Sequence, residues 1–341
     1  MGSIRVLIVD DSSFVRKALI RIFEASPGIE AAGVASTGAE AIEKVISLKP
    51  DVVTLDINMP GMDGIDTLKA IMQERPTPVL MLSQFTKRGA DLTLKALELG
   101  AMDFVDKSST GMMDFLDLAR EIVEKVTTIA GGRPVQGKDV RSGGVLICPG
   151  EGGLIDVAAV GASTGGPMAL QTLLSAFPKE VPFATLVVQH MPPGFTGPLA
   201  RRLDSFCAIR VKEAEDGDLI VPGECLVAPA GLHMTVGKGK EIPRVRLSPE
   251  PDGEIHRPSV DVLFSSVAGH FGGRAAGILL TGMGSDGARG MSEIKNRGGF
   301  TIAQDEASSA IFGMPRAAIQ RKAVDRIVPL GGIAALILSK A

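Results

Sequence analysis

The sequence predicts two α/β domains in tandem, each built around a parallel sheet with helices on both faces. Two long stretches, residues 4–129 and the region after Asp156, alternate short apolar runs with amphipathic runs. Between them, the glycines of residues 128–153 interrupt the pattern. We therefore expect domains at 1–127 and 154–341, joined by a linker at 128–153.

In the first domain, five apolar runs of strand length are separated by amphipathic runs. Ile4–Val9 leads to Asp10, and Ser12 or Ser13 is a suitable N-cap for a helix whose apolar residues fall at helical spacing from Phe14 onward. The other expected strands are Ile29–Ala35, Val52–Leu55, Pro78–Leu82 and Asp103–Val105, and the other expected helices are Gly38–Leu48, Gly89–Leu99 and Met113–Ile129.

The second domain resumes this alternation with a less regular insertion. Short runs between residues 209 and 247 are separated by Gly and Pro, which suggests inserted hairpins. The apolar run Val145–Ile147 is a candidate for one extra strand. The expected strands are Val157–Val160, Thr185–Gln189 and Ala276–Leu280, and one helix is expected to begin near Pro167.

Composition narrows the class of protein. Of the 341 residues, 45% are hydrophobic and 22% are charged, which is typical of globular domains. A net charge of −3 argues against nucleic-acid binding. The absence of a long apolar run and of a signal peptide predicts a cytoplasmic protein that does not insert into membranes. Cys148, Cys207 and Cys225 are widely spaced, which indicates a reducing compartment and neither a disulfide framework nor a zinc site.

A first group of polar residues follows the predicted strands of the first domain. Asp10 and Asp11 end the first strand, Asp56 ends the third, and Ser83 and Lys107 follow the fourth and fifth. Carboxylates that converge at one sheet edge repel each other unless a cation lies between them, and Mg²⁺ prefers such oxygen ligands. A lysine there can pair with a phosphoryl group, and an aspartate can accept one. Each aspartate taken alone is more often a turn former or a helix cap; the whole set favours a phosphorylation site.

A second group begins at a glycine-rich turn. Gly161–Gly165 fits G-x-S-x-G, and Ser163 lies between an apolar strand and a helix that Pro167 can begin. Such a turn can expose a nucleophilic serine. Alone, the turn is a weak signal, because glycine-rich turns of this kind also bind phosphates and a serine at this position more often only caps the helix.

His190 and Asp286 complete a possible triad. His190 ends the strand before it and shares the predicted sheet edge with Ser163, so it can take the hydroxyl proton. Asp286 can hold the imidazole tautomer, although alone it can instead cap a helix near Ala288. The backbone amides of its turn, including that of Met283, are oxyanion-hole candidates. The remaining histidines are interpreted as packed or solvated residues: His233, His256 and His270.

The chain order of these three residues is Ser, His, Asp. Ordinary α/β-hydrolases have the order Ser, Asp or Glu, His. The order therefore argues against that superfamily but not against a triad, which geometry defines.

The first domain resembles the receiver domain of two-component response regulators over residues 3–125. Three runs carry the resemblance: Val9–Ser12, Leu55–Gly64 and Asp103–Lys107. The resemblance implies a flavodoxin-like fold and phosphorylation by a histidine kinase. It makes Asp56 the phosphoacceptor. It also implies that Mg²⁺ is held by Asp11 and Asp56 with support from Asp10 and the backbone of Asn58, and that Ser83, Phe104 and Lys107 respond to the phosphoryl group. Ser108 stands where many receivers have proline, which leaves that local turn in doubt.

The second domain resembles the catalytic domain of the CheB family of chemotaxis protein-glutamate methylesterases over residues 155–338. The runs that carry the resemblance are Gly161–Pro167, Val188–Pro192, Arg257–Asp261, Leu280–Gly287 and Phe312–Arg316. The resemblance implies a doubly wound parallel-sheet hydrolase with Ser163, His190 and Asp286 as its triad. It implies hydrolysis of glutamate methyl esters on methyl-accepting chemotaxis receptors, which releases methanol, and deamidation of receptor glutamines. No cofactor is expected at the esterase site, and the unphosphorylated receiver is expected to obstruct it.

Three other functions are weighed against this one. A response regulator with a DNA-binding output is disfavoured because the second half has no basic recognition helix. A non-catalytic receptor-binding adaptor is disfavoured by the intact serine, histidine and aspartate. A phosphorylation-controlled hydrolase of another protein ester or amide stays open, since a triad alone does not select the substrate.

Overall fold

The chain forms two compact units in the computed structural model, Met1–Gly137 and Lys138–Ala341. The structure describes residues 2–84, 86–107, 112–132, 155–237 and 242–341. Most of the predicted linker lies outside these ranges, as do the run Val145–Ile147, Cys148 and Ser108. The domain boundaries predicted from the sequence therefore stay predictions, and each unit is described by itself.

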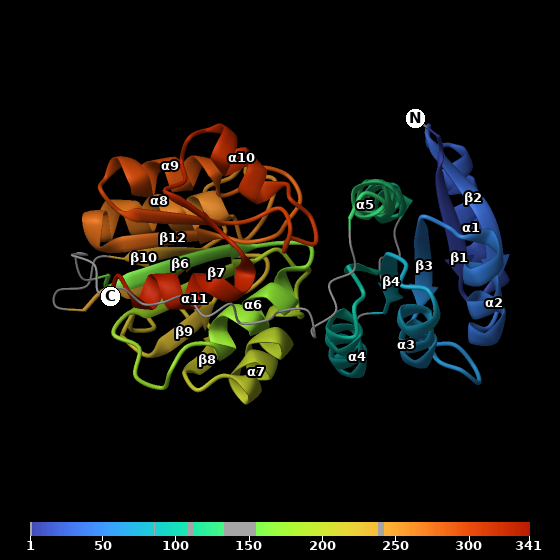
Figure 1. The fold of residues 1–341 in the computed structure, drawn as a ribbon, viewed down its shortest axis with the longest axis horizontal. Coiled ribbons are helices and arrows are strands. Elements are labelled where there is room, and N and C mark those ends of the chain that lie inside the picture. The colour runs from blue at the N-terminus through green and yellow to red at the C-terminus, as the bar shows by residue number, and fades with distance from the viewer. Residues whose placement is uncertain (1, 85, 108–111, 133–154, 238–241) are drawn as a thin grey trace. The chain divides into compact units, whose positions relative to one another are not determined.

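The first unit is a five-stranded parallel sheet with helices on both faces (Figure 1). The strand order β2-β1-β3-β4-β5 places β1 beside β3, so the ends of these two strands are neighbours. The strands are β1 (Ile4–Val9), β2 (Ile29–Ala35), β3 (Val52–Asp56), β4 (Val79–Ser83) and β5 (Asp103–Asp106), and the helices are α1 (Ser13–Glu24), α2 (Gly38–Leu48), α3 (Gly64–Glu74), α4 (Lys87–Glu98) and α5 (Met112–Ile129).

The structure confirms the predicted alternation and adds one helix, α3. Ser12, not Ser13, is the N-cap of α1, because its hydroxyl accepts from the amide of Val15. Helix α3 begins after Asp63, whose carboxylate accepts from the amide of Asp66 at 2.8 Å. A side chain at Gly64 would place its Cβ 2.1 Å from the carbonyl oxygen of Asp56. Glycine therefore lets α3 begin directly beside the end of β3.

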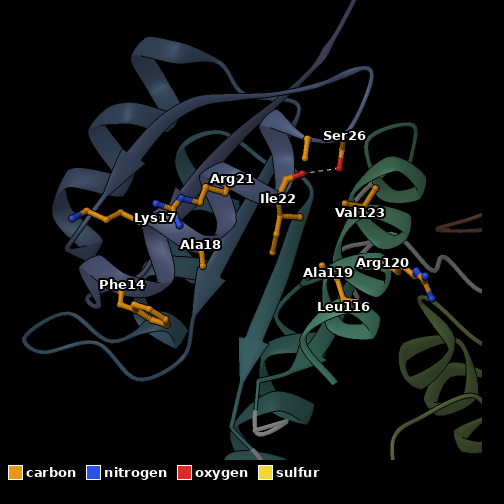
Figure 2. Close-up of a pocket in the computed structure, with 11 residues that line it drawn as sticks. Phe14, Lys17, Ala18, Arg21, Ile22, Ser26, Leu116, Ala119, Arg120 and Val123 are labelled. Carbon is orange, nitrogen blue, oxygen red and sulfur yellow. Dashed lines mark hydrogen bonds between the residues drawn. The ribbon is translucent and has the colours of Figure 1, made fainter. Parts of the chain in front are cut away.

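An open apolar groove runs between α1 and α5 (Figure 2). It has a volume of about 690 Å³, and Phe14 and Leu116 at its rim are 79% and 56% exposed. Lys17, Arg21 and Arg120 supply its charges. All of its lining residues belong to the two helices or the turn after α1, so the groove is separate from the strand ends that carry the aspartates.

The second unit contains a seven-stranded, all-parallel sheet in the order β14-β13-β12-β6-β7-β9-β8. Its strands are β6 (Val157–Ala162), β7 (Ala184–Gln189), β8 (Arg210–Glu213), β9 (Glu224–Val227), β12 (Ala275–Leu279), β13 (Phe300–Gln304) and β14 (Arg326–Val328). Its α-helices are α6 (Gly166–Ser175), α7 (Thr196–Phe206), α8 (Val260–Phe271), α9 (Ala288–Asn296), α10 (Met314–Gln320) and α11 (Leu330–Leu338).

The prediction of inserted hairpins between residues 209 and 247 was only partly right. Strands β8 and β9 pair in parallel and extend the main sheet beyond β7. Only β10 (His233–Gly237) and β11 (Arg244–Ser248) form an antiparallel pair outside that sheet. The four-residue pieces β8 and β9 are too short for their pattern to distinguish a hairpin from an edge of the main sheet.

The two faces of this sheet are covered by different helices. Figure 1 shows α8, α9 and α10 on one face and α6, α7 and α11 on the other. The chain leaves β6 toward β7 on one side and returns through β12 on the other, so the ends of β6 lie at a point where the winding reverses. Ligand sites form at such points in open parallel sheets. Among the described residues, no helix has both the length and the apolar character to cross a bilayer.

Candidate active site and phosphorylation site

Three adjacent strands bring Ser163, His190 and Asp286 together. Ser163 follows β6, His190 follows β7, and Asp286 lies in the turn after β12. The sheet order β12-β6-β7 places Ser163 on the middle strand, with the other two on its flanks. The predicted meeting of the three residues at one sheet edge therefore matches the observed topology.

The turn that carries Ser163 is held from two sides. The Ser163 amide donates to the carbonyl of Thr281 at 3.1 Å, and its carbonyl accepts from the Gln189 side chain at 2.9 Å. Gly165, not Ser163, is the N-cap of α6, and its φ of 76° is left-handed. The serine is therefore not the capping residue that the sequence left possible, and its hydroxyl is available for chemistry.

His190 contacts Asp286 through the Nε2 edge of its ring. Nε2 lies 2.8 Å from Asp286 Oδ2, and the His190 side chain is only 8% exposed. Because an ionised carboxylate only accepts, Nε2 carries a proton and Nδ1 of the neutral ring is an acceptor. Nδ1 is buried and no described residue hydrogen-bonds to it. The ring therefore presents Nδ1, at its other edge, as the nitrogen that can take a proton.

Asp286 is anchored at the N-terminus of α8. Its oxygens accept from the amides of Val260 and Asp261 at 2.7 and 2.9 Å and from the Ser259 hydroxyl at 3.0 Å. Burial by itself raises the pKa of the Asp286 carboxyl, but the hydrogen bond from His190 and these amides lower that pKa to about 2. Asp286 thus binds the first amides of α8, whose N-cap is Ser259, and it does not cap α9, whose N-cap is Gly287. A carboxylate that is ionised at neutral pH therefore faces His190.

Several residues of this site were not assigned a role from the sequence. Gln189 binds the carbonyls of Ser163 and His190 through one amide group, at 2.9 and 3.1 Å. Behind Ser259 lies His233, which is fully buried; its Nδ1 accepts from the Ser259 amide, and burial lowers the pKa of its imidazole. The run Arg257–Asp261 is one of the motifs that carry the resemblance to the methylesterase family. In the structure this run leads into α8, and its last three residues donate hydrogen bonds to the Asp286 carboxylate.

The turn after β12 approaches Ser163 closely at Gly282. A Cβ at this position would lie 2.8 Å from the Cβ of Ser163 and 2.3 Å from the sulfur of Met314. The carbonyl of Gly282 accepts from the Gly313 and Met314 amides, which holds the turn in place. Met283, the residue proposed to offer an oxyanion-hole amide, is the next residue in this turn.

We expect Gly282→Ala to slow the esterase reaction by roughly 10- to 100-fold, because an added methyl group displaces either Ser163 or the turn by a few tenths of an ångström or more. Steady-state turnover of an ester substrate is the measurement. Gly269→Ala in α8, where an added Cβ meets nothing within 4 Å, is the matched control. Equal turnover of the Gly282 variant and the wild type would contradict the argument.

The first unit has a separate polar cluster at the ends of β1, β3 and β5. The Lys107 ammonium lies 3.0 Å from Asp10 Oδ2 and 2.9 Å from Asp56 Oδ1. Asp10 is fully buried, and Asp56 is 4% exposed. Oxygens of Asp10, Asp11 and Asp56 all lie within 4.8 Å of one another, and Asp11 is exposed. The structure therefore brings together the lysine and all three predicted carboxylates.

This donor set fits a small hard cation. Burial raises the pKa of Asp56, and the nearby Lys107 ammonium opposes that rise. A divalent cation favours the ionised form further, and Mg²⁺ binds one or two carboxylates while it keeps several waters, for which the exposed Asp11 leaves room. The Asn58 amide donates to Asp56 Oδ1 at 3.3 Å, so Asn58 also lies at this site.

Ser83 and Phe104 lie on the strands that follow β3 in the sheet. The Ser83 hydroxyl is 2.8 Å from the Thr93 hydroxyl of α4, and the Ser83 carbonyl accepts from the Lys107 amide. Phe104 is 2% exposed, and the Lys125 ammonium lies 5.5 Å from its ring centroid. Ser83 therefore links the strand end to α4, and Phe104 is a buried residue of β5.

Comparison with known proteins identifies the family. Residues 158–337 match the family model for CheB methylesterase, and residues 6–116 match the model for the response regulator receiver domain. The protein-glutamate methylesterase/protein-glutamine glutaminase of Lawsonia intracellularis is 43% identical over 98% of this chain and 98% of its own length. The protein of the same name from Archaeoglobus fulgidus is 45% identical over 97% of this chain and 96% of its own length.

A solved structure supports the same assignment for the second unit. The crystal structure of the Thermotoga maritima CheB methylesterase catalytic domain is 35% identical, with a TM-score of 0.54. The match covers 55% of this chain and 99% of that one. Both resemblances predicted from the sequence motifs are confirmed. The chain belongs to the CheB methylesterase family and carries a response regulator receiver domain ahead of its methylesterase domain.

Proposed function

We propose that this protein hydrolyses glutamate methyl esters on methyl-accepting chemotaxis receptors under the control of receiver phosphorylation. The observation that carries the proposal is the contact between His190 and Asp286 at the strand end beside Ser163. This arrangement supports acyl transfer through a serine nucleophile, a histidine base and an orienting carboxylate. The matching relatives bear the name protein-glutamate methylesterase/protein-glutamine glutaminase.

Acylation begins at the Ser163 hydroxyl. His190 takes the hydroxyl proton at Nδ1 while the oxygen attacks the ester carbonyl, and the ionised Asp286 stabilises the imidazolium through Nε2. Backbone amides of the turn at Met283 stabilise the oxyanion. The tetrahedral intermediate then collapses, methanol leaves with the proton from His190, and the glutamyl group stays on Ser163.

Hydrolysis of the acyl-enzyme regenerates the site. His190 takes a proton from water, the resulting nucleophile attacks the acyl carbon, and Ser163 leaves with that proton. A free glutamate carboxylate results. The same steps with a glutamine side chain release ammonia in place of methanol, so deamidation of receptor glutamines is a second proposed reaction. These steps use side chains and backbone amides alone.

The first unit supplies the proposed control. Asp56 is the proposed phosphoacceptor for a chemotaxis histidine kinase, and Lys107 pairs with the added phosphoryl group. Asp11 and Asp56, supported by Asp10 and the Asn58 backbone, would hold Mg²⁺, which neutralises charge on the phosphoryl oxygens. We propose that phosphorylation of Asp56 changes the conformation of α4 and β5 through Ser83 and Phe104. In the unphosphorylated state the receiver is proposed to obstruct the esterase site.

We expect Asp56→Asn to remove activation by a small-molecule phosphodonor with Mg²⁺ and to leave basal esterase activity in place. Coupling between two sites in one protein typically changes affinity or activity by about 5- to 150-fold, and we expect the wild type to be activated by a factor in this range that the variant lacks. The measurement is methanol release from methylated receptor membranes, with and without the donor. Asp66→Asn, which changes an exposed aspartate of α3, is the matched control.

The same assay tests the function as a whole. Methanol release by the wild type, accelerated by the donor, supports it. If the wild type releases no methanol under any condition, the substrate assignment is wrong, and a hydrolase of another protein ester or amide or a receptor-binding adaptor becomes the better explanation. A deletion of residues 1–130 that leaves basal activity unchanged would count against obstruction by the receiver.

A further inference from the structure

A second histidine lies against the ring of His190. The imidazoles of His190 and His256 are stacked, with centroids 4.0 Å apart and planes inclined by 24°. His256 lies in the segment that leads into α8, three residues before Ser259, whose hydroxyl binds Asp286. One short segment therefore touches the His190 ring directly and also holds the carboxylate that binds its Nε2 edge.

The contact with Asp286 alone does not fix the His190 ring. The backbone is held because the His190 amide donates to the Ala162 carbonyl at 3.1 Å. The second side-chain torsion of histidine has a broad energy minimum, however. With Nε2 kept near Asp286, the ring can still rotate about the line from Cβ to Nε2, and this rotation swings Nδ1 sideways. Catalysis needs the Nδ1 lone pair directed at the serine hydroxyl, and small misplacements of a base are costly.

The stacked ring restrains this rotation. At a centroid separation of 4.0 Å, the two flat rings are in van der Waals contact over their faces, so His190 cannot tilt toward His256 without a clash. His190 is thereby constrained at one edge by Asp286 and over one face by His256. Nδ1 has no hydrogen-bond partner among the described residues, so it is the ring nitrogen that can accept the proton of the serine hydroxyl.

We propose that His256 is a positioning residue of the esterase site, whose ring sets the plane of the His190 imidazole so that Nδ1 faces Ser163. The proposal rests on the proposed function of the triad and adds a fourth residue to it. His256 acts through His190 and not on the substrate. A flat ring is what this role requires, and the acid–base properties of His256 are not required. Phenylalanine should therefore replace it well, whereas leucine, which is apolar but not flat, should not.

The test compares His256→Leu with His256→Phe in the full-length chain. The readout is the rate at which a fluorophosphonate probe labels Ser163, because this reaction reports the reactivity of the serine without any receptor. Ser163→Ala, which removes the labelled oxygen, shows that the label is on the intended residue. His270→Ala is the matched histidine control, because His270 is exposed on α8 and contacts Phe271.

We expect Ser163 in His256→Leu to be labelled about 3- to 10-fold more slowly than in the wild type, which is the rate ratio that corresponds to the interaction energy of one aromatic pair. His256→Phe should restore most of the wild-type labelling rate. For methanol release, kcat should fall with the labelling rate and KM should stay the same. Equal labelling of the leucine variant and the wild type would overturn the proposal, and so would equally slow labelling of both variants. A wild type that labels normally but releases no methanol would refute the receptor substrate and leave this test intact.

Discussion

Ser163→Ala should abolish ester hydrolysis, with a loss of at least roughly 10³-fold, because the variant has no nucleophile and retains only the oxyanion donors and substrate binding. The variant should fold normally. The Ser163 turn is held by backbone groups and by the side chain of Gln189, none of which involves the serine hydroxyl. Methanol release from methylated receptor membranes is the measurement, and mass spectrometry should show no acyl-enzyme.

A matched control separates this loss from a general effect of removing a hydroxyl group. Ser175→Ala changes an exposed serine at the end of α6, on the helix that follows the active-site turn. Its turnover should equal that of the wild type. Methanol release by Ser163→Ala within a few-fold of the wild type would show that another group attacks the ester, and the triad assignment would have to be abandoned.

Asp286→Asn should lower kcat by about 10³- to 10⁴-fold, the loss found when an amide replaces the carboxylate of a triad. An uncharged asparagine cannot stabilise the His190 imidazolium, and its side-chain NH₂ can present a donor to Nε2, which favours the wrong tautomer. Fluorophosphonate labelling of Ser163 should slow in parallel, since both reactions need the base. The control is Asp325→Asn at the amino-terminal edge of the sheet, where Asp325 binds Thr301 and Lys295.

The same carboxylate links stability to pH. The pKa of Asp286 is lowered from 3.8 to about 2 in the folded state, so its ionised form stabilises the fold above about pH 4. This contribution, about 2 kcal/mol at neutral pH, is lost as the pH falls from 4 toward 2. Denaturant unfolding of the wild type should therefore show a stability difference from Asp286→Asn that shrinks over this window. A difference independent of pH between 2 and 7 would mean that the ionised form of Asp286 does not stabilise the fold.

The pattern of strand ends made most of the site predictable. In a parallel sheet all carboxyl ends lie at one edge, so polar residues that directly follow apolar runs must lie near one another. On this argument the sequence alone predicts that Lys107 lies near Asp10 and Asp56, and that Ser163 lies near His190. Helix α3 was not predicted, because it begins with Gly64, a poor helix former, directly after a run of turn residues.

The sequence by itself determined the two α/β domains, their order, the family, and the polar residues that follow the strands carrying the two sites. The tertiary structure decided how those side chains are oriented. The Asp286 carboxylate is held in place because the first amides of α8 donate to it, and His256 stacks on His190 although 66 residues of chain separate them. Periodicity and motifs report only neighbours along the chain or along a strand edge. Which ring nitrogen faces the nucleophile, and which helix end holds the carboxylate, depend on packing between segments that are distant in sequence.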